Sequence, residues 1–291
     1  MTRRNLIKNS IIVGSGFLGL NNKIFANLLI DNNLNIFDKI INKSEKENWK
    51  KLPINELIIK IAKEFIRTPY IGGTLDKNDF EACVINLDGL DCVTFFENSL
   101  GFARIIKKEK IKYEDLIDEL TFTRYRDGKL GDYTSRLHYT SEWIIDNIKK
   151  NVVIDKTELI GGQIFKPNVY FMSKFPEKYN QLKENPDFVK KIKSIEDNIN
   201  SHSLYYLPTN EISDVEKLIE SGDILGLVTN IPGLDYSHTG IAYRDENEEL
   251  RFFHASSAKK EVLIDINLSN YMQNKKKDIG ITVLKAVEVR I

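Results

Sequence analysis

The sequence has little cysteine, little histidine and no surplus of either charge, and each shortage excludes a class of function. Lys+Arg and Asp+Glu both count 42 among 291 residues, so no net charge would attract a nucleic acid. The lysine-rich segments 105–116 and 187–197 have acidic residues interleaved, which is typical of a helix face in contact with solvent. We therefore expect no nucleic-acid partner.

The histidines and cysteines are also too few and too scattered for a metal site. The sequence has four histidines and two cysteines, with no CxxC, HxxxH or HExxH spacing. One cysteine with two histidines would leave a structural zinc one ligand short. We expect no metal and no other cofactor.

Cys83 and Cys92 stand nine residues apart and could close a small disulfide loop. Secreted proteins that are stabilised by disulfides normally contain more cysteines for their size. Two interpretations stay open at this point. Either the two residues form a disulfide, or Cys92 is free and Cys83 is buried as a small hydrophobic residue.

No apolar run reaches the roughly 20 residues that a membrane-spanning helix needs. The N-terminus instead has a basic start, ten apolar or small residues at 11–20, and small residues up to Ala26, which is the three-part pattern of a secretory signal. The start around Arg3 and Arg4 resembles a twin-arginine export signal. We expect a signal peptide at 1–26 and a periplasmic or secreted protein without stable membrane insertion. An uncleaved anchor or an ordinary first helix is the alternative.

The remainder, 27–291, is interpreted as a single α+β domain. Apolar residues recur at helical spacing from Leu57 to Phe65, which predicts an amphipathic helix that ends before Pro69. Segment 101–220 has mostly helix and loop signals. The last seventy residues contain short β-rich runs separated by turns, at 223–229, 238–244, 250–256, 261–266 and 279–289. Helices first and strands later indicate an antiparallel sheet rather than alternating βαβ units.

The stretch DGLDCVTFFENSL, residues 88–100, places Cys92 where a turn gives way to a helix. Asp91 is a good N-cap, and the apolar residues that follow recur at spacings that bury one side of a helix. A thiol at a helix N-terminus has its pKa pulled from about 8.5 into a range of roughly 3.5–7.5. The position therefore predicts that Cys92 is a nucleophile with a lowered pKa.

Two of the four histidines fit the role of a base for this thiol. His238 and His254 lie in two β-rich runs joined by the polar turn 245–249, which predicts a hairpin. The strand alternation puts both histidines on one face as near cross-strand neighbours. A nucleophile, a base and an orienting group would then be available. The alternative is a pair of histidines satisfied by local hydrogen bonds.

Five separated segments of this sequence resemble one known family. The chain is similar to the NlpC-type papain-like cysteine peptidases that trim bacterial peptidoglycan, and most of all to their N-acetylmuramoyl-L-alanine amidase-like branch. The resemblance covers about residue 57 to the C-terminus. The segments that carry it are Tyr70-Ile71-Gly72-Gly73-Thr74, Leu90-Asp91-Cys92-Val93 within CVTFFEN, Gly222-Asp223-Ile224-Leu225, Ser237-His238-Thr239-Gly240 and His254-Ala255-Ser256.

The resemblance implies a papain-like NlpC-type fold and a role for each site residue. Cys92 would be the nucleophile, His238 the general base and His254 the group that orients His238. Tyr70 and the Cys92 N–H would bind the oxyanion. The reaction would be hydrolysis, through a thioester, of the amide between N-acetylmuramic acid and L-alanine, with a preference for anhydro-muropeptides. The partners would be peptidoglycan fragments, and we expect a monomer.

The sequence departs from compact members of that superfamily in one long segment. Cys92 and His238 are 146 residues apart, so an insertion at about 101–220 is expected. Arginine suits carboxylates and aromatic rings suit sugars, so the insertion supplies four candidate substrate ligands: Arg124, Arg126, Arg136 and Tyr139. An exposed arginine-bearing loop around a buried Trp143 is the alternative.

Two other functions stay open at this level. The D-C-S-G form of the cysteine motif, found in the endopeptidases of this superfamily, is replaced here by CVTFFEN. This difference argues against a γ-D-glutamyl–diamino acid endopeptidase without excluding it. A non-catalytic peptidoglycan-binding protein with Cys83 and Cys92 oxidised is the third hypothesis.

Overall fold

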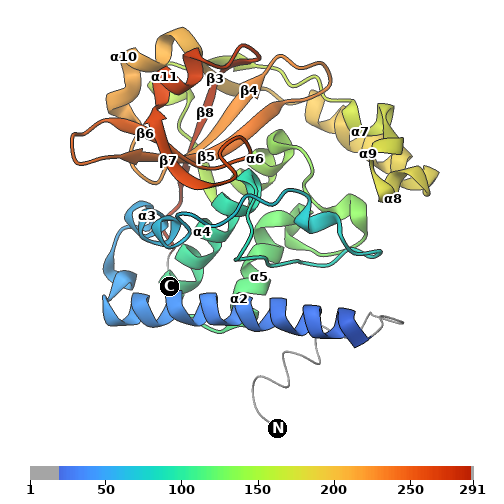
Figure 1. The fold of residues 1–291 in the computed structure, drawn as a ribbon. Helices are drawn as coiled ribbons and strands as arrows, with labels where there is room; N and C mark the ends of the chain where they lie inside the picture. The colour runs from blue at the N-terminus through green and yellow to red at the C-terminus, as the bar shows by residue number, and fades with distance from the viewer. Residues whose placement is uncertain (1–19, 290–291) are drawn as a thin grey trace.

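An antiparallel sheet occupies one half of the molecule in the computed structural model, which describes residues 20–289 and contains eight strands in that range (Figure 1). The strands are β1 (Val153–Asp155), β2 (Gln163–Phe165), β3 (Leu204–Pro208), β4 (Ile224–Thr229), β5 (Tyr236–Arg244), β6 (Leu250–Ser256), β7 (Glu261–Asn267) and β8 (Asp278–Ala286). Their order is β2-β3-β8-β4-β5-β6-β7, and β1 pairs with β8. The five β-rich runs predicted near the C-terminus correspond to β4–β8.

The α-helices gather mainly on one side of this sheet (Figure 1). They are α2 (Leu20–Lys46), α3 (Ile54–Glu64), α4 (Cys92–Lys107), α5 (Tyr113–Arg124), α6 (Thr140–Lys149), α7 (Phe171–Lys174), α8 (Asn180–Lys183), α9 (Pro186–Asn200), α10 (Ile212–Val215) and α11 (Leu268–Gln273). Short 3-10 turns lie between them: η1 (Trp49–Lys51), η2 (Thr74–Asp76), η3 (Arg126–Gly128), η4 (Tyr133–Ser135), η5 (Glu158–Ile160), η6 (Pro176–Lys178), η7 (Thr209–Glu211) and η8 (Glu216–Leu218). The predicted mixture of helices with an antiparallel sheet is confirmed.

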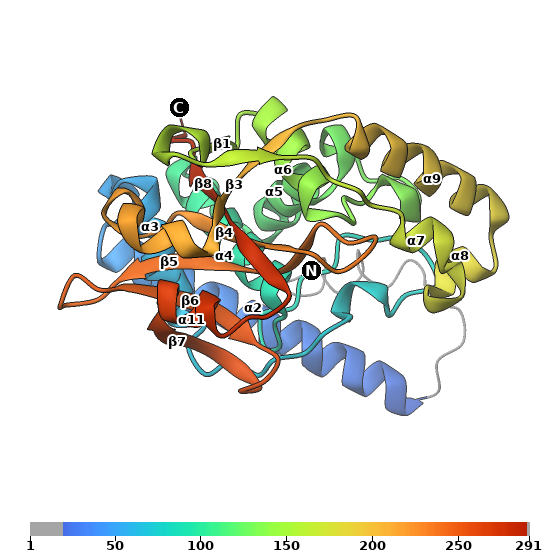
Figure 2. The ribbon, with the colours of Figure 1, turned by 90° about the horizontal axis from the view of Figure 1, so that it is seen from above.

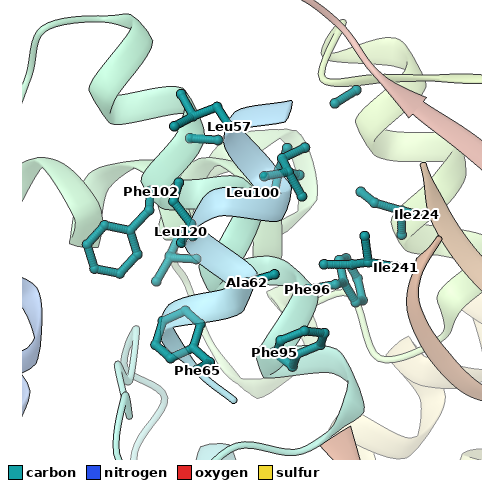
Figure 3. Close-up of a cluster of buried hydrophobic side chains, with 14 of the residues drawn as sticks. Leu57, Ala62, Phe65, Phe95, Phe96, Leu100, Phe102, Leu120, Ile224 and Ile241 are labelled. Atoms are coloured by element: carbon teal, nitrogen blue, oxygen red, sulfur yellow. The ribbon is translucent and has the colours of Figure 1, made fainter. Parts of the chain in front are cut away.

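The main core lies between α4 and one face of the sheet (Figure 3). The ring centroids of Phe95 in α4 and Phe253 in β6 are 5.1 Å apart, and Ile241 of β5 lies in the same cluster. The predicted amphipathic helix is α3, which adds Leu57 and Ala62 to this core. Burial of such apolar side chains stabilises a fold by about 1.5–3 kcal/mol each. Helix α4 is therefore fixed firmly against the strands that carry the two histidines.

A second core covers the opposite face of the sheet. It joins Leu227 of β4, Ala242 of β5 and Phe252 of β6 to Met272 of α11. Because successive strand residues point to opposite faces, Ala242 of β5 and Leu250 and Phe252 of β6 face this second core, while Ile241 of β5 and Phe253 and Ala255 of β6 face α4. A register shift between β4 and β5 lies near the start of β5, where Tyr236 packs in the main core. His238 and His254 follow the alternation of Ala242 and Phe252, so they share one face.

Helix α2 lies across α4 and α5 at the end of the molecule that is remote from the sheet (Figure 1). Its described buried face begins at Asn33, whose side-chain amide donates to the Ile85 carbonyl at 3.2 Å and accepts from the Leu87 N–H at 2.7 Å. The predicted export motif at Arg3 and Arg4 lies outside the described residues, and the predicted cleavage point after Ala26 falls within α2. The α2 residues whose burial is described therefore follow the predicted cleavage point.

The segment 101–220 folds mostly as helix and loop, as predicted, but it also contributes β1, β2 and β3 to the sheet. Two of these strands are only three residues long, too short for an alternating pattern to be recognised. Helices α7, α8 and α9 project from one side of the molecule, well away from α3 (Figure 2). Within residues 20–289 no helix combines the length and apolar character needed to cross a membrane.

Candidate active site

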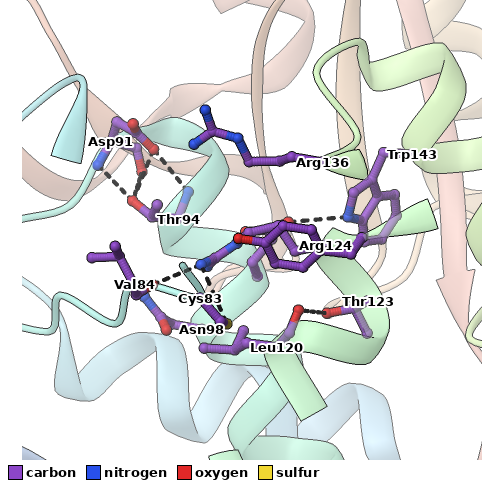
Figure 4. A network of polar contacts seen from close by, with 12 residues as sticks. Cys83, Val84, Asp91, Thr94, Asn98, Leu120, Thr123, Arg124, Arg136 and Trp143 are labelled. Carbon is purple, nitrogen blue, oxygen red and sulfur yellow. Dashed lines mark hydrogen bonds and ion pairs between the residues drawn. The ribbon is translucent and has the colours of Figure 1, made fainter. Parts of the chain in front are cut away.

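Cys92 is the first residue of α4, where the sequence places it. The Asp91 side chain accepts the Thr94 N–H at 2.8 Å, and the Thr94 hydroxyl accepts the Asp91 N–H at 2.9 Å (Figure 4). This reciprocal capping box fixes the helix start at Cys92. The predicted N-cap is confirmed.

The thiol of Cys92 lies against strand β5. Hydrogen bonds from Thr239, the residue that follows His238, and from the Val93 N–H favour its ionised form. Loss of hydration and the adjacent Asp91 carboxylate outweigh them and raise the pKa of Cys92 to about 11. The predicted lowering of this pKa is therefore wrong for the free protein. The residue that caps the helix also places a negative charge beside the thiol.

The two histidines meet as the hairpin predicts. Ile241 of β5 is paired with Phe253 of β6, so the next step of the ladder brings Gly240 opposite His254. His238 is therefore a diagonal neighbour of His254 on the same face. The Nε2 atom of His238 lies 2.6 Å from Nδ1 of His254, a hydrogen-bonding distance. The predicted cross-strand pairing is confirmed.

A carboxylate continues this chain of contacts. The Nε2 atom of His254 lies 3.3 Å from Oδ2 of Asp265 in β7. His254 also stacks on Phe252, with ring centroids 4.4 Å apart. The chain of contacts thus runs from Asp265 through His254 to His238, and we call these three residues the imidazole relay.

Both imidazoles of the relay are neutral at neutral pH. Burial is the main cause that lowers the pKa of His238 to about 3, and the charges of His254 and Lys275 add to it. Burial likewise lowers the pKa of His254 to about 4, against the opposing effect of Asp265. A neutral imidazole can accept a proton, which is what a general base requires.

Tyr70 lies beside the start of α4. It pairs with Leu90 in an isolated bridge, and the Ile71 N–H donates to the Leu90 carbonyl at 3.0 Å. Burial, followed by the nearby Cys92 and Asp91, raises the pKa of Tyr70 to about 12. Its hydroxyl therefore keeps its proton and can donate a hydrogen bond.

The arginines predicted as substrate ligands have partners inside the protein. Arg124 is only 2% exposed; its Nε donates to Glu97 at 2.8 Å and its Nη1 to the Val84 carbonyl at 2.6 Å (Figure 4). Arg136 pairs with Asp76 and lies 3.5 Å from Glu81. These contacts engage both arginines within the protein, although the buried Nη2 of Arg124 and Nε of Arg136 have no hydrogen-bond partner among the described residues.

The other two predicted ligands are engaged in the same way. Arg126 donates to Glu142 from Nε at 2.8 Å. The Tyr139 hydroxyl donates to Glu196 at 2.8 Å, and both of these side chains are buried. Binding of substrate by Arg124, Arg126, Arg136 and Tyr139 stays a prediction.

Both cysteines are free, so the disulfide interpretation does not describe this structure. Cys83 packs partly buried against the main core, with its Sγ 3.6 Å from the Ile117 carbonyl and 3.9 Å from Nη1 of Arg124. Burial raises the pKa of its thiol. Cys83 is therefore a neutral packing residue, as the other interpretation expects.

Asp265 is the functional candidate that sequence reasoning missed. It lies in the run EVLIDI, where an acidic residue interrupts an apolar strand. That interruption was the available signal, because a carboxylate in a largely buried strand needs a partner. Among residues 20–289 no three or more His, Cys, Asp or Glu side chains are grouped so as to hold a metal ion.

A thiol at a helix start and a histidine on the strand beside it are the groups that cysteine hydrolases use. This chain belongs to the AmiA-like family, whose model, described as N-acetylmuramoyl-L-alanine amidase-like, matches residues 60–281. Comparison with the curated proteins gives no match.

Solved structures resemble the chain over most of its length. An N-acetylmuramoyl-L-alanine amidase from Bacteroides uniformis is 34% identical with a TM-score of 0.76, and the match covers 80% of this chain and 98% of that one. A Bacteroides fragilis protein provisionally named a xylanase is 36% identical with a TM-score of 0.74, covering 78% and 99%. A Legionella pneumophila protein shares the fold at 21% identity and a TM-score of 0.64, covering 88% and 95%.

Proposed function

We propose that this protein is a cysteine amidase that hydrolyses the bond between N-acetylmuramic acid and L-alanine in peptidoglycan fragments. The contact between His238 and His254, on the strands beside Cys92, is the observation that carries the proposal. Membership of an amidase-like family and the similarity to a Bacteroides uniformis amidase support the substrate class. We further propose that the fold is of the papain-like NlpC type and that the anhydro form of the sugar is preferred.

The first half of the reaction would acylate Cys92. The Sγ atom attacks the carbonyl carbon of the lactyl group while its proton passes to His238. The carbonyl oxygen becomes an oxyanion, and the C–N bond then breaks as His238 returns the proton to the departing amine of L-alanine. A thioester between Cys92 and the muramic acid remains.

The second half would release the sugar acid. Water attacks the thioester carbonyl and gives a proton to His238, and the C–S bond breaks as that proton returns to Cys92. In this scheme the thiol is neutral at rest, consistent with its raised pKa, and loses its proton only during attack. His254 holds the His238 ring in place throughout.

The oxyanion would be bound at the start of α4. In this turn the Thr94 N–H donates to the Asp91 side chain and the Phe95 N–H to the Asp91 carbonyl at 3.0 Å. The first N–H groups of a helix have no partner within it, so we assign the Cys92 N–H as one oxyanion donor. The protonated hydroxyl of Tyr70 is the second.

The xylanase name of one neighbour describes a different chemistry. Glycosidases generally act with two carboxylates placed about 5–9.5 Å apart across the bond. Here Asp91 is committed to the helix cap, and Asp265 to His254 and Lys259. A thiol at the start of α4 and two imidazoles on the adjoining strands favour acyl transfer.

We also propose the predicted organisation and location. Residues 1–26 would be a signal peptide and 27–291 one catalytic domain, with the insertion at 101–220 forming the flank that contains α7–α9. The protein would act as a monomer in the periplasm or outside the cell, where wall fragments occur. The described part of the buried face of α2 follows Ala26, so signal cleavage would leave the described core intact.

The test is digestion of purified anhydro-muropeptides by the protein, with the products identified by mass spectrometry. We expect release of a free peptide that begins with L-alanine, and loss of that product in the Cys92→Ala variant. Cys83→Ala is the matched control and should keep its activity. Cleavage inside the stem peptide would make the protein an endopeptidase. Tight retention of the fragments without turnover would make it a binding protein, and either result overturns the proposal.

A further inference from the structure

We propose that Asp265 is a positioning residue of this site: it determines which ring nitrogens of His254 and His238 carry protons, and so leaves Nδ1 of His238 free to accept the Cys92 proton. Its effect on the reaction rests on the function proposed above. The assignment of the protons rests on the hydrogen bonds among the three residues and on their charge states, and does not depend on the reaction.

His254 pairs with Leu263, so the alternation along β7 places Asp265 on the same face as His254, at the start of a β-bulge. In the β6–β7 ladder Arg251 pairs with Asn267, but Phe253 pairs with Ile264. Asp265 and Ile266 therefore stand together opposite the single residue between Arg251 and Phe253. Such bulges bend the strand and redirect a side chain, and they are common next to active sites.

The two carboxylate oxygens of Asp265 have separate partners. Oδ1 accepts the Ile266 N–H at 2.8 Å and the Lys259 ammonium at 2.9 Å, while Oδ2 faces Nε2 of His254 at 3.3 Å. The side chain is only 7% exposed. Burial alone would raise its pKa, but these hydrogen bonds lower it, so the group is ionised and can only accept.

This acceptor fixes the protons of both imidazoles in turn. A neutral imidazole carries one proton, and the proton of His254 must be on Nε2 to donate to Asp265. Nδ1 of His254 is then an acceptor, and across the 2.6 Å contact it must receive the Nε2–H of His238. His238 is left with an unprotonated Nδ1. The opposite tautomer of His254 would set its Nε2 lone pair against the carboxylate.

Replacement of Asp265 by asparagine should reverse which ring nitrogens of His254 and His238 carry the protons. The Ile266 N–H and Lys259 both donate to the Oδ1 position, so the amide oxygen must occupy it and the NH₂ group must face His254. The proton of His254 then moves to Nδ1 and donates to Nε2 of His238. That histidine must carry its own proton on Nδ1, where the base is needed. Asp265→Ala removes the acceptor without imposing the reversed order.

The direct measurement is ¹⁵N NMR of the imidazole nitrogens in the full chain labelled at histidine, at neutral pH and without substrate. We expect Nε2 protonated and Nδ1 unprotonated in both His238 and His254 of the parent, and the reverse in Asp265→Asn. Nδ1 protonated in the parent would overturn the proposal, as would an unchanged pattern in a folded Asp265→Asn. The parent spectrum is decisive even if a variant fails to fold.

A second readout is the rate at which anhydro-muropeptides are turned over. We expect losses of about 10-fold for Asp265→Ala and about 100-fold for Asp265→Asn, in the range found when a group that orients a reacting ligand is removed. A purely structural role predicts the opposite order, because asparagine keeps the shape and the bulge contacts; that order overturns the proposal. The NMR result does not depend on the substrate, so it separates this proposal from the amidase itself.

Discussion

The carboxylate of Asp91 lies beside the thiol of Cys92 and, after loss of hydration, is the next cause of the raised pKa of that thiol. The same carboxylate holds the first turn of α4 through Thr94. One side chain thus begins the helix and opposes ionisation of the nucleophile.

Substitutions of Asp91 separate these two effects. Asp91→Asn keeps an oxygen for the Thr94 N–H but removes the charge, so the pKa of Cys92 should fall with little change in stability. Asp91→Ala removes both, and should also cost about 0.5–2 kcal/mol in the free energy of unfolding. Alkylation rate against pH and urea unfolding measure the two quantities. An unchanged pKa of Cys92 in Asp91→Asn would contradict the conclusion that the Asp91 charge raises it.

The pH dependence of Cys92 alkylation in the parent is a further test. With a thiol pKa of about 11, the reactive thiolate is scarce at neutral pH. The alkylation rate should therefore rise about tenfold per pH unit between pH 7 and 10. Cys92→Ala supplies the background from Cys83. A rate that is already constant between pH 5 and 8 would instead mean that a thiolate is present at rest.

The buried ion pair of Arg124 and Glu97 should be structural. Arg124→Met leaves the Glu97 charge buried without its partner, which typically destabilises a protein by about 3–5 kcal/mol. The double variant Arg124→Met/Glu97→Gln should recover part of that loss. Urea unfolding gives the energies, and activity should follow the folded fraction. Loss of activity in a fully folded Arg124→Met would support the predicted role in substrate binding.

Acid should destabilise the fold through its buried histidines. Burial, with the charges of Arg136 and Arg126, lowers the pKa of His138 to about 3, below the value near 6.5 of an unfolded chain. The unfolded state therefore binds the proton first, and stability that is complete above pH 6.5 is lost as the pH falls toward 3. The loss is at most about 1.4 kcal/mol per pH unit for each such histidine.

His138→Gln isolates one of these groups. His138 donates from Nε2 to the Tyr133 carbonyl at 2.8 Å, and a glutamine amide can replace that donor without titrating. The variant should match the parent near pH 7 and lose less stability at pH 4.5, measured by urea unfolding. Equal losses in both proteins would mean that His138 titrates normally in the folded state.

The local parts of the site could be predicted from sequence. The cap at Asp91 and the alternation that puts His238 and His254 on one face depend on neighbouring residues, and both are confirmed. The pKa of Cys92 depends on how much water reaches the thiol, which the packing of α4 on β5 determines. Asp265 reaches His254 because Leu263 pairs with His254, and that register between β6 and β7 cannot be read from either strand alone.

The predicted ligands in the insertion show the same limit. Arg136 finds its partner Asp76 sixty residues away, and Arg124 finds Glu97 on a different helix. A sequence shows that such side chains can bind carboxylates, but not whether the carboxylate belongs to a substrate or to the protein. The short strands β1 and β2 were missed because their pairing partners, and not their own three residues, define them.

The place of β8 in the sheet has a consequence for how the molecule is made. Of the strands described, β8 is the last to be synthesised, yet it lies between β3 and β4 and also pairs with β1. Pairings so distant in sequence are slow to form because a long loop must close first. Until residue 286 has left the ribosome, β3 and β4 have no strand to join them. The imidazole relay on β5, β6 and β7 can assemble earlier, because these three strands form a local meander. Strand β8 then completes the sheet by pairing with β3 and β4.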